Sequence, residues 1–245
     1  MFRLGLLNPN TDERHTVAMR EVALGVLPGG CDVIAVTAER GPSSIESDVD
    51  SVVAAAQVVT MVGDLSGLDA YLVACFGDPG LEAARELTVA PVVGIGEAAF
   101  QAAAMIAKRF GIITTLPRGA PALEDALAQK GIQSRCVGVA SLDIPVADQG
   151  SHNPGTTLAI VEAGRSLVNG LGAEALVLAC GAMADVAKAV EDGVGVPVCD
   201  GVAFGAMTAY SLWRCGLSTS KIGAYGWPER IPYVGMPSPG IPQGG

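Results

Sequence analysis

Leu72-Val73-Ala74-Cys75-Phe76-Gly77-Asp78-Pro79-Gly80 is the stretch that decides the fold. Its apolar start is typical of a buried strand, and the turn after Cys75 leads into a helix, with Asp78 as the expected cap and Pro79 as its first residue. The pattern recurs around Cys180, in Leu176-Val177-Leu178-Ala179-Cys180-Gly181-Ala182-Met183-Ala184. Such internal similarity indicates two similar lobes, each of which presents one thiol.

The segments that flank these two stretches are also similar to each other. Residues 3–11 resemble residues 109–115, and residues 91–93 resemble residues 197–199. Along the whole chain, short apolar runs alternate with segments of helical spacing, which is typical of parallel sheets covered by helices on both sides. Strands are predicted at 4–7, 31–36, 71–74, 92–95, 110–114, 134–139, 176–179 and 196–199. Helices are predicted at 12–27, 49–63, 81–87, 97–108, 121–130, 156–170, 183–191 and 202–213.

The predicted fold class is α/β, with two pseudo-symmetric Rossmann-like lobes and an active site in the cleft between them. Lobe 1 comprises residues 1–97 with 205–245, and lobe 2 comprises residues 98–204, so the helices at 97–108 and 202–213 are expected to cross between lobes. In the first helix, Val17, Val22, Ala23 and Val26 have the spacing of an apolar face. Residues 225–245 lack periodicity and are expected to be extended or partly disordered.

The composition indicates a globular protein, and the lack of a recognisable signal peptide or membrane-spanning run leads us to expect it in the cytoplasm. Half of the 245 residues are apolar, enough to bury a core, and modest size with apolar richness favours a homo-oligomer. The net charge of −10 disfavours nucleic acids and anionic membranes as partners, because neither polyanion attracts an acidic protein. No basic region precedes the first apolar residues, and no apolar run reaches the ~18 residues that a bilayer requires.

The chemistry of the chain is expected where the predicted strands end. Ligands of open parallel sheets bind at the carboxyl ends of the strands, where residues 8–11, 43–45, 75–78, 114–115 and 180–181 fall. A pseudo-twofold axis would place Cys75 and Cys180 opposite each other. A thiol can carry a proton when a helix N-terminus lowers its pKa toward neutrality. Two such thiols on opposite sides of one carbon would invert a stereocentre.

Other kinds of site find little material in the sequence. The cysteines lack Cys-x-x-Cys spacing and only two histidines are present, so neither a structural zinc nor a Ser-His-Asp triad is expected. Gly94-Ile95-Gly96 resembles the start of a dinucleotide-binding loop, but Ala99 stands where that loop has its third glycine, so NAD binding is not expected. His15 is expected in solvent, His152 is not assigned to the cleft, and Asp200 is expected to orient backbone amides. The remaining cysteines are expected to be small buried apolar residues: Cys31, Cys136, Cys199 and Cys215.

Several motifs together resemble the hydantoin racemases of the aspartate/glutamate racemase superfamily. They are Asn8-Pro9-Asn10-Thr11, Gly41-Pro42-Ser43-Ser44-Ile45-Glu46, Ala74-Cys75-Phe76-Gly77-Asp78-Pro79-Gly80-Leu81, Leu178-Ala179-Cys180, Met183-Ala184-Asp185, Val196-Pro197-Val198-Cys199-Asp200-Gly201-Val202 and Gly216-Leu217-Ser218-Thr219-Ser220-Lys221. The resemblance implies a cofactor-independent racemase of 5-monosubstituted hydantoins, with Cys75 and Cys180 as the acid/base thiols. It also implies that the substrate contacts Asn10, Ser44, Ile45, Thr114, Thr115 and the turns after the cysteines, at Phe76, Gly77 and Gly181.

One departure from the family pattern leaves the substrate open. The family has Gly-Cys-Ala-Gly-Met-Ala where this chain has Ala179-Cys180-Gly181-Ala182-Met183-Ala184. The alternatives are an allantoin racemase, a decarboxylase or cis-trans isomerase of the same superfamily, and a small-molecule binding protein without turnover. A hydantoin agrees with the expected site, since removal of its C5 proton gives an enolate that backbone amides can stabilise without a metal.

Overall fold

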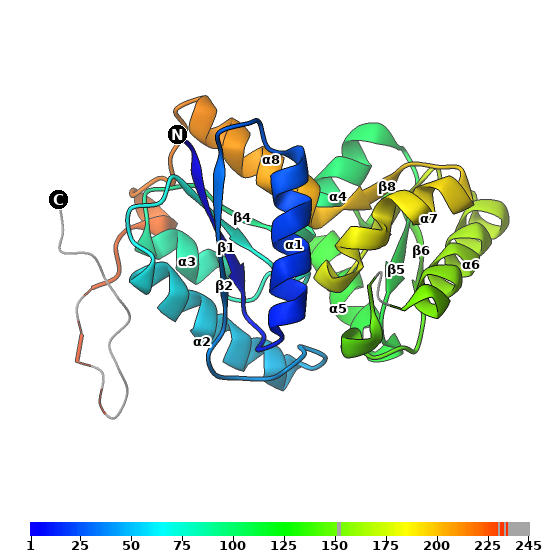
Figure 1. Cartoon of the computed structure of the whole chain (residues 1–245), viewed down its shortest axis with the longest axis horizontal. Helices are drawn as coiled ribbons and strands as arrows, with labels where there is room; N and C mark the ends of the chain where they lie inside the picture. The colour runs from blue at the N-terminus through cyan, green and yellow to red at the C-terminus, as the bar shows by residue number, and fades with distance from the viewer. Residues whose placement is uncertain (151–152, 230, 233, 235–245) are drawn as a thin grey trace.

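The structure is a computed structural model that describes residues 1–150, 153–229, 231–232 and 234. Figure 1 shows two α/β halves that lie side by side. In the described residues each half contains a four-stranded sheet, with strand order β2-β1-β3-β4 in the first and β6-β5-β7-β8 in the second. Every strand pair is parallel. The repeated strand order confirms the predicted α/β fold with two similar lobes.

The first half alternates strands and helices from the start of the chain. Its elements are β1 (Arg3–Asn8), α1 (Glu13–Val26), β2 (Asp32–Thr37), α2 (Asp48–Asp64), β3 (Ala70–Val73), α3 (Leu81–Leu87) and β4 (Val92–Gly94). Side chains of a strand alternate between the two faces of the sheet. Leu4 and Leu6 therefore pack with α1, whereas Leu7 and Val73 pack with α2 and α3.

The second half repeats this arrangement with longer connections. Its elements are α4 (Ile95–Ile106), β5 (Phe110–Thr114), η1 (Pro117–Gly119), α5 (Ala120–Gln129), η2 (Gln133–Arg135), β6 (Cys136–Ser141), η3 (Val146–Asp148), α6 (Pro154–Leu171), β7 (Ala175–Leu178), η4 (Gly181–Val186), α7 (Ala187–Val194), β8 (Val198–Asp200), α8 (Gly201–Arg214) and η5 (Gly223–Tyr225). One face of this sheet packs with α4 and α5, and the other packs with α6 and α7. The helix predicted at 183–191 is instead the 3-10 helix η4 followed by α7.

The helix predicted to follow the Cys75 turn has a different cap from the expected one. Gly80, in the left-handed region at φ 72°, is the N-cap of α3, so the helix begins after Pro79. A Cβ on Gly80 would lie 2.8 Å from the carbonyl oxygen of Ala55, and the close pass of α2 therefore requires glycine here. Asp78 caps α4 instead, because its carboxylate accepts the backbone N–H groups of Gly96 and Glu97 at 2.9 and 2.7 Å.

The helices α4 and α8 connect the two halves, as the sequence predicts. α4 leaves β4 and packs against β7 and β8, while α8 leaves β8 and packs against β3 and β4. Figure 1 shows that α8 lies along the first half and that α4 begins beside it. The lobe boundaries after residues 97 and 204 stay a prediction, and they fall inside these two helices. No helix in the described part of the chain combines the length and apolar character that a bilayer crossing requires.

The two crossing helices meet most closely where both begin. A Cβ on Gly201 would lie 2.1 Å from the backbone oxygen of Ile95, so an alanine there must push the helices apart. Buried apolar residues continue from this contact into the first half, and one core cluster contains Ile95 and Val202 together with Leu4 and Leu6. The junction between the halves is therefore part of the core.

We expect Gly201→Ala to lower the free energy of unfolding by about 1–3 kcal/mol, because the added methyl group overpacks the junction. Gly25→Ala is the matched control, since Gly25 is exposed in α1 and its Cβ would meet nothing within 4 Å. That change should raise the same free energy by about 0.5–1 kcal/mol, because alanine loses less backbone entropy than glycine. Urea unfolding followed by circular dichroism measures both, and equal stabilities of the two variants would contradict the close contact.

Candidate active site

A cavity of about 190 Å³ lies between the two halves, at the carboxyl ends of the strands. Its walls come from the residues that follow β1, β3, β5 and β7 and from the segment before α2. The equivalent strands of the two halves thus contribute to one space. This is the edge at which open parallel sheets bind their ligands.

Cys75 and Cys180 both line this cavity from equivalent positions. Each lies two residues beyond the end of its strand, Val73 in β3 and Leu178 in β7. The residue before each cysteine donates its N–H to the neighbouring central strand at 2.8 Å, Ala74 to Leu7 and Ala179 to Ile113. Both thiols are free, as are the other four cysteines. The repeat therefore places two similar thiols in one cavity.

The pKa values of the two thiols differ from the expected ones. Burial raises the pKa of Cys75 to about 12 and that of Cys180 to about 11. Backbone N–H groups act in the opposite direction, from Gly77 toward Cys75 and from Ala182 toward Cys180. The prediction of a pKa near neutrality is wrong because loss of water outweighs these contacts. In addition, α3 begins only at Leu81, well beyond Cys75.

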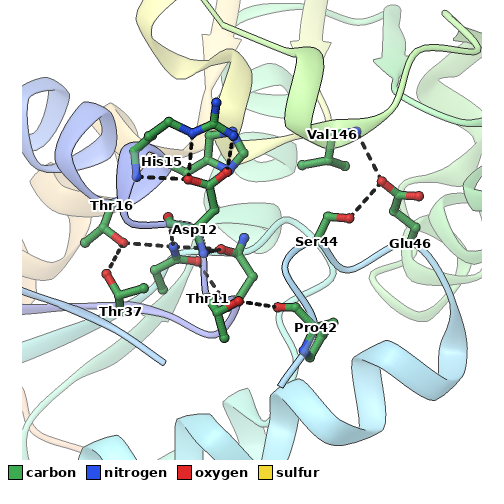
Figure 2. Close-up of polar contacts among 12 residues, drawn as sticks. Thr11, Asp12, His15, Thr16, Thr37, Pro42, Ser44, Glu46 and Val146 are labelled. Carbon is green, nitrogen blue, oxygen red and sulfur yellow. Dashed lines mark hydrogen bonds and ion pairs between the residues drawn. The ribbon is translucent and has the colours of Figure 1, made fainter. Parts of the chain in front are cut away.

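Asn10 is held in the cavity wall by a buried polar network, part of which is drawn in Figure 2. Its side-chain oxygen accepts from the amide of Asn8 at 3.0 Å and from the backbone N–H of Asp12 at 2.9 Å. Asn8 also donates to Thr16 at 2.9 Å, and the Thr16 hydroxyl lies 2.6 Å from that of Thr37. With the oxygen of Asn10 engaged, its NH₂ group is the part that can donate to a ligand.

The cavity brings together most of the site residues that the sequence predicts. Besides the two cysteines, it is lined by Asn10, Ile45, Phe76, Gly77, Thr114, Thr115 and Gly181. Ser44 is not among the lining residues, because its hydroxyl turns aside and donates to Oε1 of Glu46 at 2.9 Å. A Cβ on Gly181 would lie 2.7 Å from the sulfur of Met19 on α1. Glycine at this position, where the family pattern has alanine, therefore leaves room for the Met19 side chain.

His15 is the main residue of the cavity wall that sequence reasoning misses. It is 5% exposed rather than solvated, because α1 packs against η4 and turns His15 and Met19 toward the cavity. Its Nδ1 lies 3.9 Å from Oδ2 of Asp12. The predicted apolar face of α1 is wrong in part: Ala23 is buried and Val22 packs against the core, but Val17 and Val26 are 54% and 41% exposed. The spacing of His15, Thr16, Met19 and Ala23, which are the buried residues, is the signal that indicates the true face.

Other cavity residues come from the connecting segments and from the first turn of α2, and most of them carry charge or polarity. They are Glu46, Ser47, Asp48, Ser51 and Arg118, and Val146 adds an apolar side chain. No periodicity marks such positions, because their placement depends on how the loops pack. The residues that line the cavity therefore include two acidic residues, Glu46 and Asp48, and the basic residue Arg118, in addition to the two cysteines.

The remaining predicted residues lie apart from the cavity. Asp200 caps α8 by accepting from Val202 and Ala203 at 3.0 and 2.9 Å. Cys199 is buried, whereas Cys215 is exposed at the end of α8, so the expectation of burial is wrong there. Cys31 and Cys136 are half-buried. His152 and most of the 225–245 tail lie outside the described residues, and within those residues no cluster of three His, Cys, Asp or Glu side chains could hold a metal ion.

Comparison with known proteins identifies the family. Residues 4–209 match the model of the Asp/Glu/hydantoin racemase family. A hydantoin racemase of Pseudomonas sp. (strain NS671) is 36% identical over 96% of this chain and 95% of its own length, and one of Rhizobium meliloti is 37% identical over 93% and 95%. The solved structure of an allantoin racemase from Klebsiella pneumoniae matches with a TM-score of 0.92 at 37% identity, and covers 96% of this chain and 97% of its own. The chain therefore belongs to the Asp/Glu/hydantoin racemase family, and it is a racemase, an enzyme of the isomerase class.

Proposed function

We propose that this racemase inverts the C5 centre of 5-monosubstituted hydantoins without a cofactor, with Cys75 and Cys180 as its two acid/base groups. The observation that carries the proposal is the presence of both thiols in one cavity, at equivalent strand ends of two similar halves. A group on each side of the substrate is what inversion requires. We further expect the enzyme to act in the cytoplasm as a homo-oligomer.

The proposed reaction begins when the thiolate of one cysteine removes the C5 proton. The electron pair of the C–H bond moves into the neighbouring carbonyl and forms an enolate. The thiol of the other cysteine then donates its proton to the opposite face of C5, and that cysteine becomes the thiolate. Each turnover thus exchanges the protonation states of Cys75 and Cys180, and the reverse reaction restores them.

The enolate oxygen needs hydrogen-bond donors at the cavity wall. The NH₂ group of Asn10 and the hydroxyl groups of Thr114 and Thr115 are available on this wall, together with the backbone N–H groups of the turns at Phe76 and Gly181. Positioned acid/base groups contribute about 10²–10⁴ to a rate, and an oxyanion donor contributes about 10²–10³. Rate contributions of this size are sufficient for removal of the C5 proton, because the neighbouring carbonyl already makes this proton acidic.

The buried cavity makes each thiolate a strong base. Because burial raises both pKa values, the resting site holds neutral thiols at neutral pH, and the reactive form is the one in which a single proton has been lost. A base of raised pKa is better matched to a weak carbon acid than an ordinary thiolate. The cost is a small population of the reactive form near neutrality.

Allantoin, a hydantoin with a ureido group at C5, is the second candidate substrate. The carboxylates of Glu46 and Asp48 on the cavity wall could accept the N–H groups of a ureido substituent. Phe76, Leu116 and Leu123 on the same cavity suit an apolar substituent instead. A decarboxylase, a cis-trans isomerase and a binding protein without turnover do not invert a stereocentre, so two thiols in one cavity favour a racemase over all three.

We expect Cys75→Ser and Cys180→Ser each to lower the rate of racemisation at least about 10²-fold, because each variant lacks one of the two proton carriers. Proton NMR of single enantiomers of 5-benzylhydantoin and of allantoin in D₂O measures both C5 exchange and inversion. Each variant should also retain faster C5 exchange for one enantiomer than for the other. Cys215→Ser is the control, since this thiol is exposed and away from the cavity.

Two outcomes of this experiment would reject parts of the proposal. Full activity of either cavity variant would exclude the two-thiol mechanism. Absence of exchange and inversion with both substrates in the wild type would exclude this substrate class. Of two active substrates, the one with the higher kcat/KM identifies the preferred C5 substituent.

We expect kcat/KM to rise about tenfold per pH unit between about pH 6 and 9, because the thiolate fraction of a group with a raised pKa grows throughout this range. Rates of iodoacetamide alkylation, followed for each cysteine by mass spectrometry, provide the independent measurement. The midpoints for Cys75 and Cys180 should lie at higher pH than the midpoint for a small thiol such as N-acetylcysteine under the same conditions. A kcat/KM maximum near pH 7, together with alkylation midpoints below that of the small thiol, would show instead that the pKa values of Cys75 and Cys180 are lowered.

A further inference from the structure

One hydrogen bond joins the two halves directly at the cavity. Oε1 of Glu46, in the segment before α2, accepts the backbone N–H of Val146 at 3.2 Å. The same oxygen accepts the hydroxyl of Ser44 at 2.9 Å, and Figure 2 shows both contacts. Glu46 and Val146 both line the cavity, so this bond closes part of its wall.

The N–H of Val146 has no capping side chain within its own half. Val146 is the first residue of η3, and its N-cap is Pro145, which provides no side-chain hydrogen bond. The first N–H groups of a helical turn need an acceptor from elsewhere. Glu46 provides that acceptor from a position 100 residues away in the chain. A bond to an ionised carboxylate is also stronger than one between neutral groups.

The Glu46 side of this contact is braced within the first half. The backbone N–H of Glu46 donates to Asp50 at 3.2 Å, and the Ser47 hydroxyl donates to the same carboxylate at 2.7 Å. The start of the segment is also fixed, because the N–H of Thr11 donates to the carbonyl of Pro42 at 3.0 Å. Glu46 is therefore presented from a loop that is tied both to α2 and to the turn after β1.

The Val146 side is braced by the strand end that carries two predicted substrate contacts. Leu142 donates its N–H to the carbonyl of Thr114 at 3.0 Å, and Ile144 donates to that of Thr115 at 3.3 Å. The fully buried Gln149 donates to the carbonyl of Ile144 at 3.0 Å. The bond between Glu46 and Val146 thus connects the Ser44-Ile45 segment with the Thr114-Thr115 segment across the cavity.

We propose that Glu46 is a positioning residue that latches the two halves over the substrate by binding the backbone N–H of Val146. When the latch forms, the two wall segments lie close enough to hold one small ring, and when it breaks, the cavity is open for exchange. The expected effect on racemisation rests on the proposed function, whereas the effect on access to the cavity thiols does not.

The sharpest test removes the backbone N–H of Val146 and keeps the backbone conformation at this position. Val146→Pro deletes the donor at the first position of a helical turn, where proline is tolerated. Val146→Ala is its matched control, since it shortens the side chain but keeps the N–H. Relative to Val146→Ala, we expect Val146→Pro to lower kcat/KM about tenfold, mainly through KM, because one charged hydrogen bond is lost. Alkylation of Cys75 and Cys180 by a fluorescein maleimide should accelerate by about the same factor, with the exposed Cys215 as the internal reference.

A second pair of variants tests the other partner and separates the latch from the charge. Glu46→Gln keeps an oxygen that can accept both N–H and hydroxyl, whereas Glu46→Ala removes the acceptor. The negative charge of Glu46 also raises the pKa of Cys180, so Cys75 is the thiol that reports the latch. Glu46→Ala should accelerate alkylation of Cys75 by the maleimide, and Glu46→Gln should not. In the double variant Glu46→Ala with Val146→Pro, Cys75 should be alkylated no faster than in Val146→Pro alone, because both changes remove the same bond between the halves.

The latch is rejected if Cys75 is alkylated at the same rate in Val146→Pro and Val146→Ala. It is also rejected if the increases in this rate caused by Glu46→Ala and Val146→Pro add in the double variant. If Val146→Pro fails to fold by circular dichroism, the comparison of Glu46→Ala with Glu46→Gln decides in the same way. Faster alkylation in an enzyme that racemises neither hydantoin nor allantoin would support the latch and reject the proposed substrate class.

Discussion

The close approach of backbone to backbone at the start of α4 is the constraint on which the rest of the structure depends. A Cβ on Gly96 would lie 2.0 Å from the carbonyl oxygen of Phe76, so the turn after Cys75 rests directly on the first turn of α4. Asp78 fixes the same contact by accepting two N–H groups of that turn. Since α4 also meets α8 without space for a side chain at Gly201, the position of the Cys75 thiol is tied to the junction between the halves.

The fold and the two thiols could be predicted because both depend on local and repeated patterns. Buried parallel strands read as short apolar runs, and the repeat around Cys75 and Cys180 identifies these two cysteines among six. The face of α1 was not predictable in the same way. This helix is covered by η4 as well as by its own sheet, so a histidine lies on a buried face while valines remain in solvent.

The other loop residues of the cavity and the ionisation of its thiols depend on tertiary structure, which local sequence patterns do not predict. Glu46, Arg118 and Val146 reach the cavity from connecting segments of different halves, and no spacing rule relates positions that far apart. The thiol pKa values follow from how much water the assembled halves exclude, which reverses the direction expected from a neighbouring helix. The same exclusion of water that raises the pKa also strengthens every hydrogen bond that the cavity can offer to an enolate.

The shared core cluster has a consequence for the order in which the chain becomes structured during synthesis. Leu4 and Leu6 of β1 pack in the same cluster as Val202, Ala206 and Ala209 of α8, although most of the second half separates them in sequence. The first sheet is complete in sequence at β4, and α1 already covers part of this face, but the part that packs against α8 stays uncovered until α8 has left the ribosome. The nascent first half therefore exposes apolar sheet surface while the second half is being made, a stage at which exposed apolar surface favours aggregation and binding by chaperones.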